Sequence, residues 1–240
     1  MSYFIEGNFP TFKQFLNEIN YGSLQKDDRI NKICDALKKD ILYSLEKYTL
    51  YGSVLVTIPI KTKNPFAAAK NIKWSVKLNK VKQPEFFTDG GYFDREQEKI
   101  VFGLFYDTDK SDEQFLRQFK EHIESGKIDE TLKHEIKHYL DKLDGKFTKD
   151  NYVSIDPITA SAAKKTKYVS QNREIESWLI SVLSDIEYIK KSNPHFSIQE
   201  VFMESKVYNT FMKYLHPSKR NKYKNKIIHF WYTEILGHNQ

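Results

Sequence analysis

The chain has 240 residues, 40% of them hydrophobic, and a formal net charge of +6. This length and hydrophobic content suit one large domain or two tightly joined lobes, and no apolar run approaches the ~20 residues that a membrane span requires. The N-terminus lacks the basic and apolar regions of a secretory signal, and the single cysteine, Cys34, excludes an intrachain disulfide, so we expect the cytoplasm or another reducing compartment.

The first half of the chain shows both helical and strand patterns. Apolar residues at helical spacing predict helices, and alternation of apolar and polar residues predicts strands. A turn-rich segment, residues 87–99 with Gly90-Gly91, is expected to join the last two strands. The predicted helices cover residues 10–20, 24–50 and 111–125, and the predicted strands cover residues 53–60, 73–81 and 99–106.

A His-Glu-Ile-Lys-His motif follows at residues 134–138. Asp129 and Glu130 favour a helix N-terminus before it, Gly145 marks the helix end, and an apolar stripe gives the segment helical periodicity. Two histidines four residues apart on a helix lie on one face and can bind one zinc, and a glutamate between them can reach a water on the metal. The stripe consists of Leu132, Ile136, Leu140 and Leu143.

After a loop over 145–166 the chain is expected to be almost entirely helical. A catalytic zinc usually takes three protein ligands, and Glu174 and Glu176 fall in the first turns of the next helix. The loop and the returning helix are long enough to place the carboxylate of either glutamate at the metal. The predicted helices cover residues 172–192, 196–215 and 218–236.

These two segments resemble the zincin metallopeptidases, specifically the gluzincin branch with two histidines and a glutamate. The sequence YVSQNREIESW, residues 168–178, is similar to the second motif of small peptidases of this kind, in which a Tyr- and Asn-bearing segment precedes a Glu-x-Glu pair. The resemblance implies that His134, His138 and Glu174 bind one Zn²⁺ per chain. It also implies that Glu135 is the general base.

The resemblance has departures. Many gluzincins carry an aspartate four residues after the ligand glutamate, and here that position is Trp178. Asp141 or Glu176 is the candidate for orienting a histidine, and Glu176 also stays open as the third ligand. Tyr168 is a candidate for stabilising the oxyanion.

The expected fold is α+β and zincin-like. A strand-plus-helix N-terminal lobe with a small mixed sheet, residues 1–147, ends in the motif helix, and a helical C-terminal lobe, residues 148–240, carries the third ligand. The active-site helix lies between the lobes. By the same resemblance residues 99–106 form a sheet-edge strand that binds an extended substrate; an internal core strand is the alternative.

The expected function is zinc-dependent hydrolysis of polypeptides by an endopeptidase, with Glu135 activating water. A zinc-binding module without catalysis and a basic nucleic-acid-associated protein are the alternatives. Lysines near 164–167 and 218–226 are interleaved with tyrosines, but no nucleic-acid motif accompanies them, so a solvated surface is the preferred interpretation. Lys133 and Lys137 are expected to face solvent. A cellular and a viral or phage origin both fit the sequence.

Overall fold

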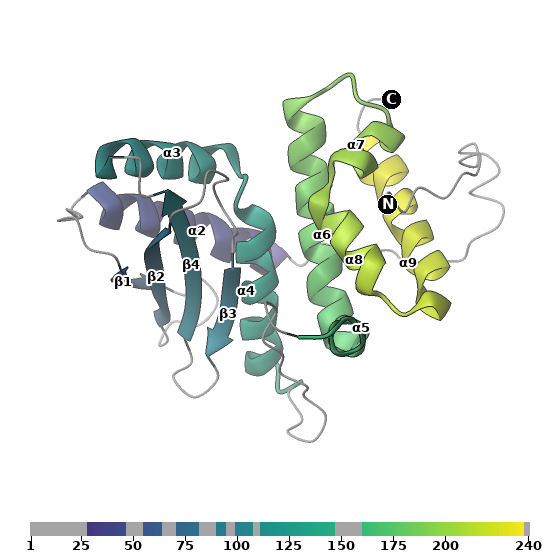
Figure 1. Ribbon diagram of the computed structural model, residues 1–240, viewed down its shortest axis with the longest axis horizontal. Helices are drawn as coiled ribbons and strands as arrows, with labels where there is room; N and C mark the ends of the chain where they lie inside the picture. The colour runs from purple at the N-terminus through teal and green to yellow at the C-terminus, as the bar shows by residue number, and fades with distance from the viewer. Residues whose placement is uncertain are drawn as a thin grey trace. The chain divides into compact units, whose positions relative to one another are not determined.

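The computed structural model describes residues 28–46, 55–63, 71–81, 90–94, 99–107, 111–146 and 160–237. These residues form an α+β structure that is mostly helical and contains one small sheet, as predicted (Figure 1). They fall into two compact units, one within Asp27–Thr148 and the other within Lys149–Gln240. The helix predicted over 10–20 lies outside the described residues. Within the described ranges, no helix is long and apolar enough to span a membrane.

The sheet of the first unit is mixed and has the strand order β1-β2-β4-β3. The two inner strands run parallel, and each outer strand pairs antiparallel with its neighbour. The strands are β1 (Leu55–Lys63), β2 (Asn71–Val81), β3 (Gly90–Asp94) and β4 (Lys99–Asp107).

Two predictions about this sheet are wrong. The segment 87–99 contains a strand, β3, because Gly90–Asp94 pairs with Lys99–Gly103 of β4, a partnership that the two glycines do not signal. The predicted substrate-binding edge strand, β4, is internal, since β2 and β3 pair with its two sides. Lys99–Gly103 of β4 are therefore paired on both sides and cannot take up a peptide by strand pairing. The edges of the described sheet are β1 and β3.

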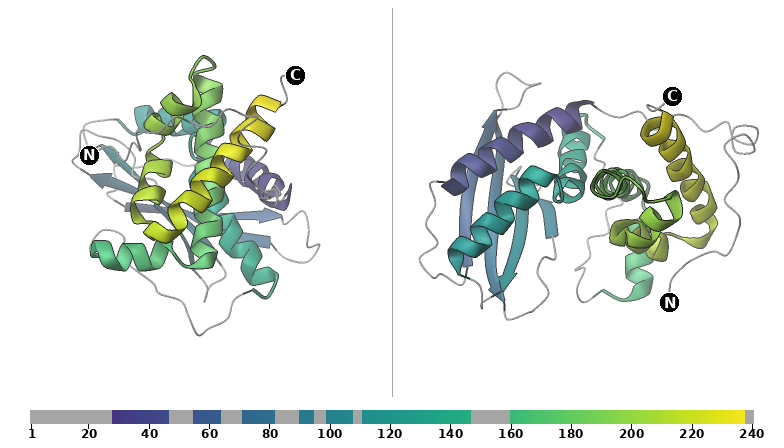
Figure 2. Two further views of the ribbon diagram at one scale, coloured as in Figure 1. Left: turned by 90° about the vertical axis from the view of Figure 1, so that its right-hand side faces the viewer. Right: turned by 90° about the horizontal axis from the view of Figure 1, so that it is seen from above.

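Three helices complete the first unit. Helices α2 and α3 cross one face of the sheet, and α4 packs against α2, β3 and β4 (Figure 2). Ile72, Trp74 and Val76 of β2 are buried, as the two-residue period of a strand requires for one face. Cys34 of α2 lies in this core, where burial raises the pKa of its thiol. The helices are α2 (Asp28–Glu46), α3 (Asp112–Ser125) and α4 (Asp129–Leu143).

The second unit is helical and surrounds one long helix, α6, which contacts the other α-helices of the unit. Its apolar residues form one buried cluster with side chains from α7, α8 and α9. The helices are α5 (Ala162–Val169), α6 (Asn172–Ser192), α7 (Ile198–Glu204), α8 (Lys206–Tyr214) and α9 (Pro217–Phe230), which continues as a π-helical segment, η2 (Trp231–Leu236).

Two features of this unit differ from the sequence prediction. Helix α5 begins inside the predicted loop over 145–166, where the Ser161 side chain accepts a hydrogen bond from the Lys164 N–H and caps the helix. The single helix predicted over 196–215 is broken at Ser205. The Ser205 hydroxyl accepts the Tyr208 N–H at 3.0 Å and donates to the Asp185 carboxylate at 2.6 Å, so its side chain starts α8 and fixes it to α6.

Candidate metal site

The two motif histidines lie one turn apart on α4, as predicted. Their ring centroids are 4.9 Å apart and the ring planes meet at 76°. His138 is buried and His134 is half-buried, while Leu132 and Ile136 of the same helix are fully buried in the core. The helix is therefore anchored by its apolar side and presents two imidazoles side by side.

The ends of α4 explain its length. The helix begins at Asp129, whose carboxylate accepts a hydrogen bond at 2.9 Å from the Lys38 ammonium group of α2. It ends at Leu143, and Gly145 follows with a φ of +67°, a left-handed conformation that favours glycine. The predicted apolar stripe ends at Leu140, because Leu143 is 42% exposed in the last turn.

The residues between and beside the histidines are more enclosed than the sequence suggests. Glu135 is only 6% exposed. The expectation that Lys133 and Lys137 face solvent is wrong, because their side chains are 14% and 12% exposed and pair with carboxylates one turn away. Lys133 pairs with Asp129 at 3.9 Å, and Lys137 donates a short hydrogen bond to Asp141. The positive charges of these two lysines are therefore balanced by aspartate carboxylates on the same helix.

Glu174 stands in the first turn of α6, where the positive end of the helix dipole favours a carboxylate. Its side chain is fully buried. A buried carboxylate is costly unless positive charge lies near it, and the Arg173 guanidinium is 3.8 Å from its Oε1 atom. The nearby guanidinium and the helix dipole therefore offset part of the cost of burying this carboxylate.

Glu176 lies on a different side of α6. It is exposed, whereas Glu174 is buried. Burial and, to a lesser extent, the negative charge of Glu176 raise the pKa of Tyr223 on α9. Two residues along a helix correspond to a rotation of about 200°, so the two glutamate side chains point to different sides of α6.

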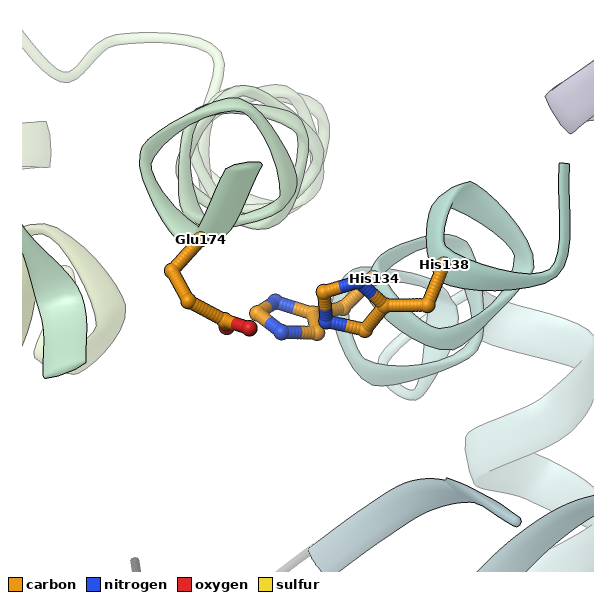
Figure 3. A group of neighbouring side chains, drawn as sticks. All are labelled: His134, His138 and Glu174. Atoms are coloured by element: carbon orange, nitrogen blue, oxygen red, sulfur yellow. The ribbon is translucent and has the colours of Figure 1, made fainter. Parts of the chain in front are cut away.

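The structure brings three of the predicted site residues together. One ligand atom each from His134, His138 and Glu174 all lie within 4.8 Å of one another. Figure 3 shows the Glu174 carboxylate extending from α6 toward the two imidazole rings of α4. Among the described residues this is the group of His, Cys, Asp and Glu side chains whose geometry could hold a metal ion.

The chemistry of these donors fits zinc. Two imidazole nitrogens and one carboxylate oxygen are the ligand set of one class of catalytic zinc site, in which the fourth position is left for water or substrate. Calcium and magnesium prefer sites made of oxygen ligands only. Within the described part of the chain three side chains contribute ligand atoms, which leaves one position of a tetrahedron open.

Other predicted participants have defined surroundings. The Asp141 carboxylate is buried and accepts from Lys137, with the Lys146 ammonium group 3.7 Å away. Its role in orienting a histidine stays a prediction. Trp178, which occupies the position of the aspartate in many gluzincins, stacks on Phe211 with ring centroids 6.2 Å apart. The Trp178 side chain therefore packs against the apolar core of the helical unit.

Tyr168, the candidate oxyanion stabiliser, lies on α5. Its half-buried side chain packs against the apolar cluster of the helical unit. Its role at an oxyanion stays a prediction. Arg173 is the site residue that sequence reasoning missed. The available signal was its position in the first helical turn, directly before the predicted ligand Glu174.

A scan against protein-family models, a search of curated proteins and a search of solved structures each found no match to this chain. We therefore infer the function from the geometry and chemistry of the site.

Proposed function

We propose that this protein is a zinc-dependent metallopeptidase with a zincin-like active-site helix. In this proposal His134, His138 and Glu174 hold one zinc ion per chain, and Glu135 is the general base. The observation that carries the proposal is the approach of the three ligand atoms to within 4.8 Å of one another.

The division of roles follows from position. Zinc at such a site supplies Lewis acidity, which lowers the pKa of water and polarises a carbonyl group. Glu135 is adjacent to His134 in the sequence, about 100° further around the helix, and it does not belong to the set of three possible ligands. It accepts the proton of the water that attacks the peptide carbonyl, then delivers that proton to the amine as the C–N bond breaks.

The burial of the site residues supports the same proposal. Glu135, His138 and Glu174 are at most 8% exposed. A polar group costs free energy when it is buried, so a cluster of ionisable side chains withdrawn from water indicates a function that repays this cost. Enclosure also strengthens electrostatic interactions with a developing oxyanion.

The test combines metal analysis with hydrolysis of casein and a peptide library. The parent protein should hold about one zinc per chain and cleave peptides. Glu135→Gln should keep the zinc and the fold but lose at least ~10²–10⁴-fold in turnover, because the amide cannot accept the proton. Glu130→Gln, the same change at another glutamate of α4, is the matched control and should retain activity.

Each result has a distinct meaning. Zinc binding by the parent without any peptide cleavage would point to a zinc-binding interaction module. If Glu135→Gln cleaved as fast as the parent, Glu135 would not be the base, and the peptidase proposal would fail. If the parent protein bound no zinc, the proposal would be refuted.

A further inference from the structure

The helical unit carries many basic side chains on three of its helices. Helices α5, α8 and α9 contain lysine and arginine but no aspartate or glutamate. Together with their tyrosines they form what we call the basic surface. Its residues are Lys164, Lys165 and Lys167 of α5, Lys213 and Tyr214 of α8, and Lys219, Lys222, Tyr223 and Lys226 of α9.

Several contacts join these helices into one surface. The Lys165 ammonium group lies 5.6 Å from the centre of the Tyr214 ring, which connects α5 with α8. The Lys219 ammonium group of α9 donates to the Ser170 carbonyl at the end of α5, and the His216 N–H donates to the Ser170 hydroxyl. In Figure 1 the ends of these helices gather at the same end of the helical unit.

Some of the cations have structural roles. The Arg220 guanidinium donates to the carbonyl groups of Lys213 and Leu215 and so completes the end of α8. Lys219 is bound to Ser170 and to the Asn172 side chain. These groups are occupied in holding the helices together, and they are not the cations that a partner would need.

Four lysines have a different arrangement. Lys165 and Lys213 both lie over the Tyr214 ring, at 5.6 and 5.2 Å from its centre. Lys222 and Lys226 both lie over the Tyr223 ring, at 5.6 and 5.8 Å. Within the described part of the chain none of these four lysines forms an ion pair. The negative charge of Glu176 acts on Tyr223, the ring below Lys222 and Lys226.

Two ammonium groups collected around one ring repel each other, and a cation–π contact at an exposed site returns only ~0.5–1 kcal/mol. A phosphate placed against either pair would be attracted by two positive charges at once. We propose that the basic surface binds single-stranded nucleic acid through its backbone phosphates. The half-buried tyrosine rings favour nucleic acid over an acidic polypeptide, because sites for single strands combine cations with aromatic side chains.

The residues also indicate the mode of recognition. The four cations are lysines, which act as point charges, whereas base-specific contacts in DNA depend largely on the fork of an arginine side chain. Arg220 is already committed to two backbone carbonyls. We therefore expect binding that is independent of sequence and strongly dependent on salt. This inference does not rest on the proposed peptidase activity.

The experiment measures fluorescence anisotropy of a labelled oligothymidine with the full chain over a series of salt concentrations. The double variant Lys213→Gln/Lys222→Gln removes one exposed lysine from each ring. Its affinity should fall at least ~10-fold, and the slope of log K against log salt should decrease by roughly 1.4, or about 0.7 per lost phosphate contact. The matched control, Lys39→Gln/Lys127→Gln, changes the net charge equally at exposed lysines of the other unit and should bind as the parent does.

Three results would overturn the inference: no salt-dependent binding by the parent, an equal loss in both double variants, or competition by polyglutamate as effective as that by unlabelled oligothymidine. The last would assign the surface to acidic polypeptides. Glu135→Gln should bind the oligonucleotide as tightly as the parent, so failure of the peptidase proposal would leave this result unaffected.

Discussion

Glu174 and Glu176 show how two residues of the same type, two positions apart, acquire different roles. Glu174 is fully buried beside Arg173 and offers an oxygen to the group that includes His134 and His138, whereas Glu176 is exposed. The sequence left both open as the third ligand. The surroundings in the structure favour Glu174, because one of its carboxylate oxygens belongs to the group that could hold a metal.

A comparison of two alanine variants tests this choice. Glu174→Ala should weaken zinc affinity by far more than the ~10–100-fold expected for loss of a group that only orients a ligand. Glu176→Ala is the matched control and should bind zinc nearly as the parent does. The measurement is competition for zinc with a chelator of known affinity. The reverse ranking would move the third ligand to Glu176.

Helices α2 and α4 are tied together near both ends of α4. Lys38 pairs with Asp129 at the start of α4, and Arg29 donates two hydrogen bonds to Asp144 just after its end, at 3.0 and 2.9 Å. The two pairs fix the position of the helix that carries the histidines. The Arg29–Asp144 pair is partly exposed, so its contribution to stability is expected to be modest.

The pH dependence of this second pair can be predicted. The hydrogen bonds from Arg29 lower the pKa of Asp144 below its usual 3.8. A folded-state pKa below the unfolded value means that the stabilisation is complete above pH 3.8 and is lost as the pH falls through the lowered pKa. Asp144→Asn should reduce the free energy of unfolding by about 0.5–1 kcal/mol at neutral pH.

Chemical denaturation at several pH values measures this effect. The difference between parent and Asp144→Asn should shrink as the solution becomes more acidic than the usual carboxyl pKa. In an Arg29→Gln background the same substitution should have a smaller effect, because Lys146, 3.7 Å from the Asp144 carboxylate, is then the remaining partner. A difference that is independent of pH would show that the carboxylate charge is not its source.

At the scale of the whole chain, the proposed zinc site takes its ligands from His134, His138 and Glu174, whose ligand atoms lie within 4.8 Å of one another. Metal that binds the folded chain and not the unfolded one stabilises the fold by mass action. At a free zinc concentration one hundred times the Kd the gain is ~2.7 kcal/mol, which for a chain of this size raises Tm by roughly 5–10 °C.

Thermal melts of chelator-treated and zinc-reconstituted protein measure this stabilisation. Zinc should restore the higher Tm of the parent, and His138→Ala should melt at the same temperature with and without zinc. Equal melting of the metal-free and zinc-loaded parent would argue that the three side chains do not form one site in solution.

Several features of this protein were determined by its local sequence. Helix α6 has the predicted bounds, and α3 and α4 lie within a residue or two of theirs, because helical periodicity and capping residues act over a few positions. The proximity of His134 and His138 belongs to the same group, since four residues along a helix make slightly more than one turn. The general α+β class followed from the alternation of helical and strand patterns.

Other features were decided only by tertiary structure. Strand β3 exists through its pairing with β4, and that pairing also moves β4 from the edge of the sheet to its interior. Ser205, at the break between α7 and α8, donates a hydrogen bond to Asp185, twenty residues earlier in the chain. The difference between Glu174 and Glu176 is one of burial and neighbours. These outcomes depend on contacts between distant segments, which periodicity and spacing along a single segment do not encode.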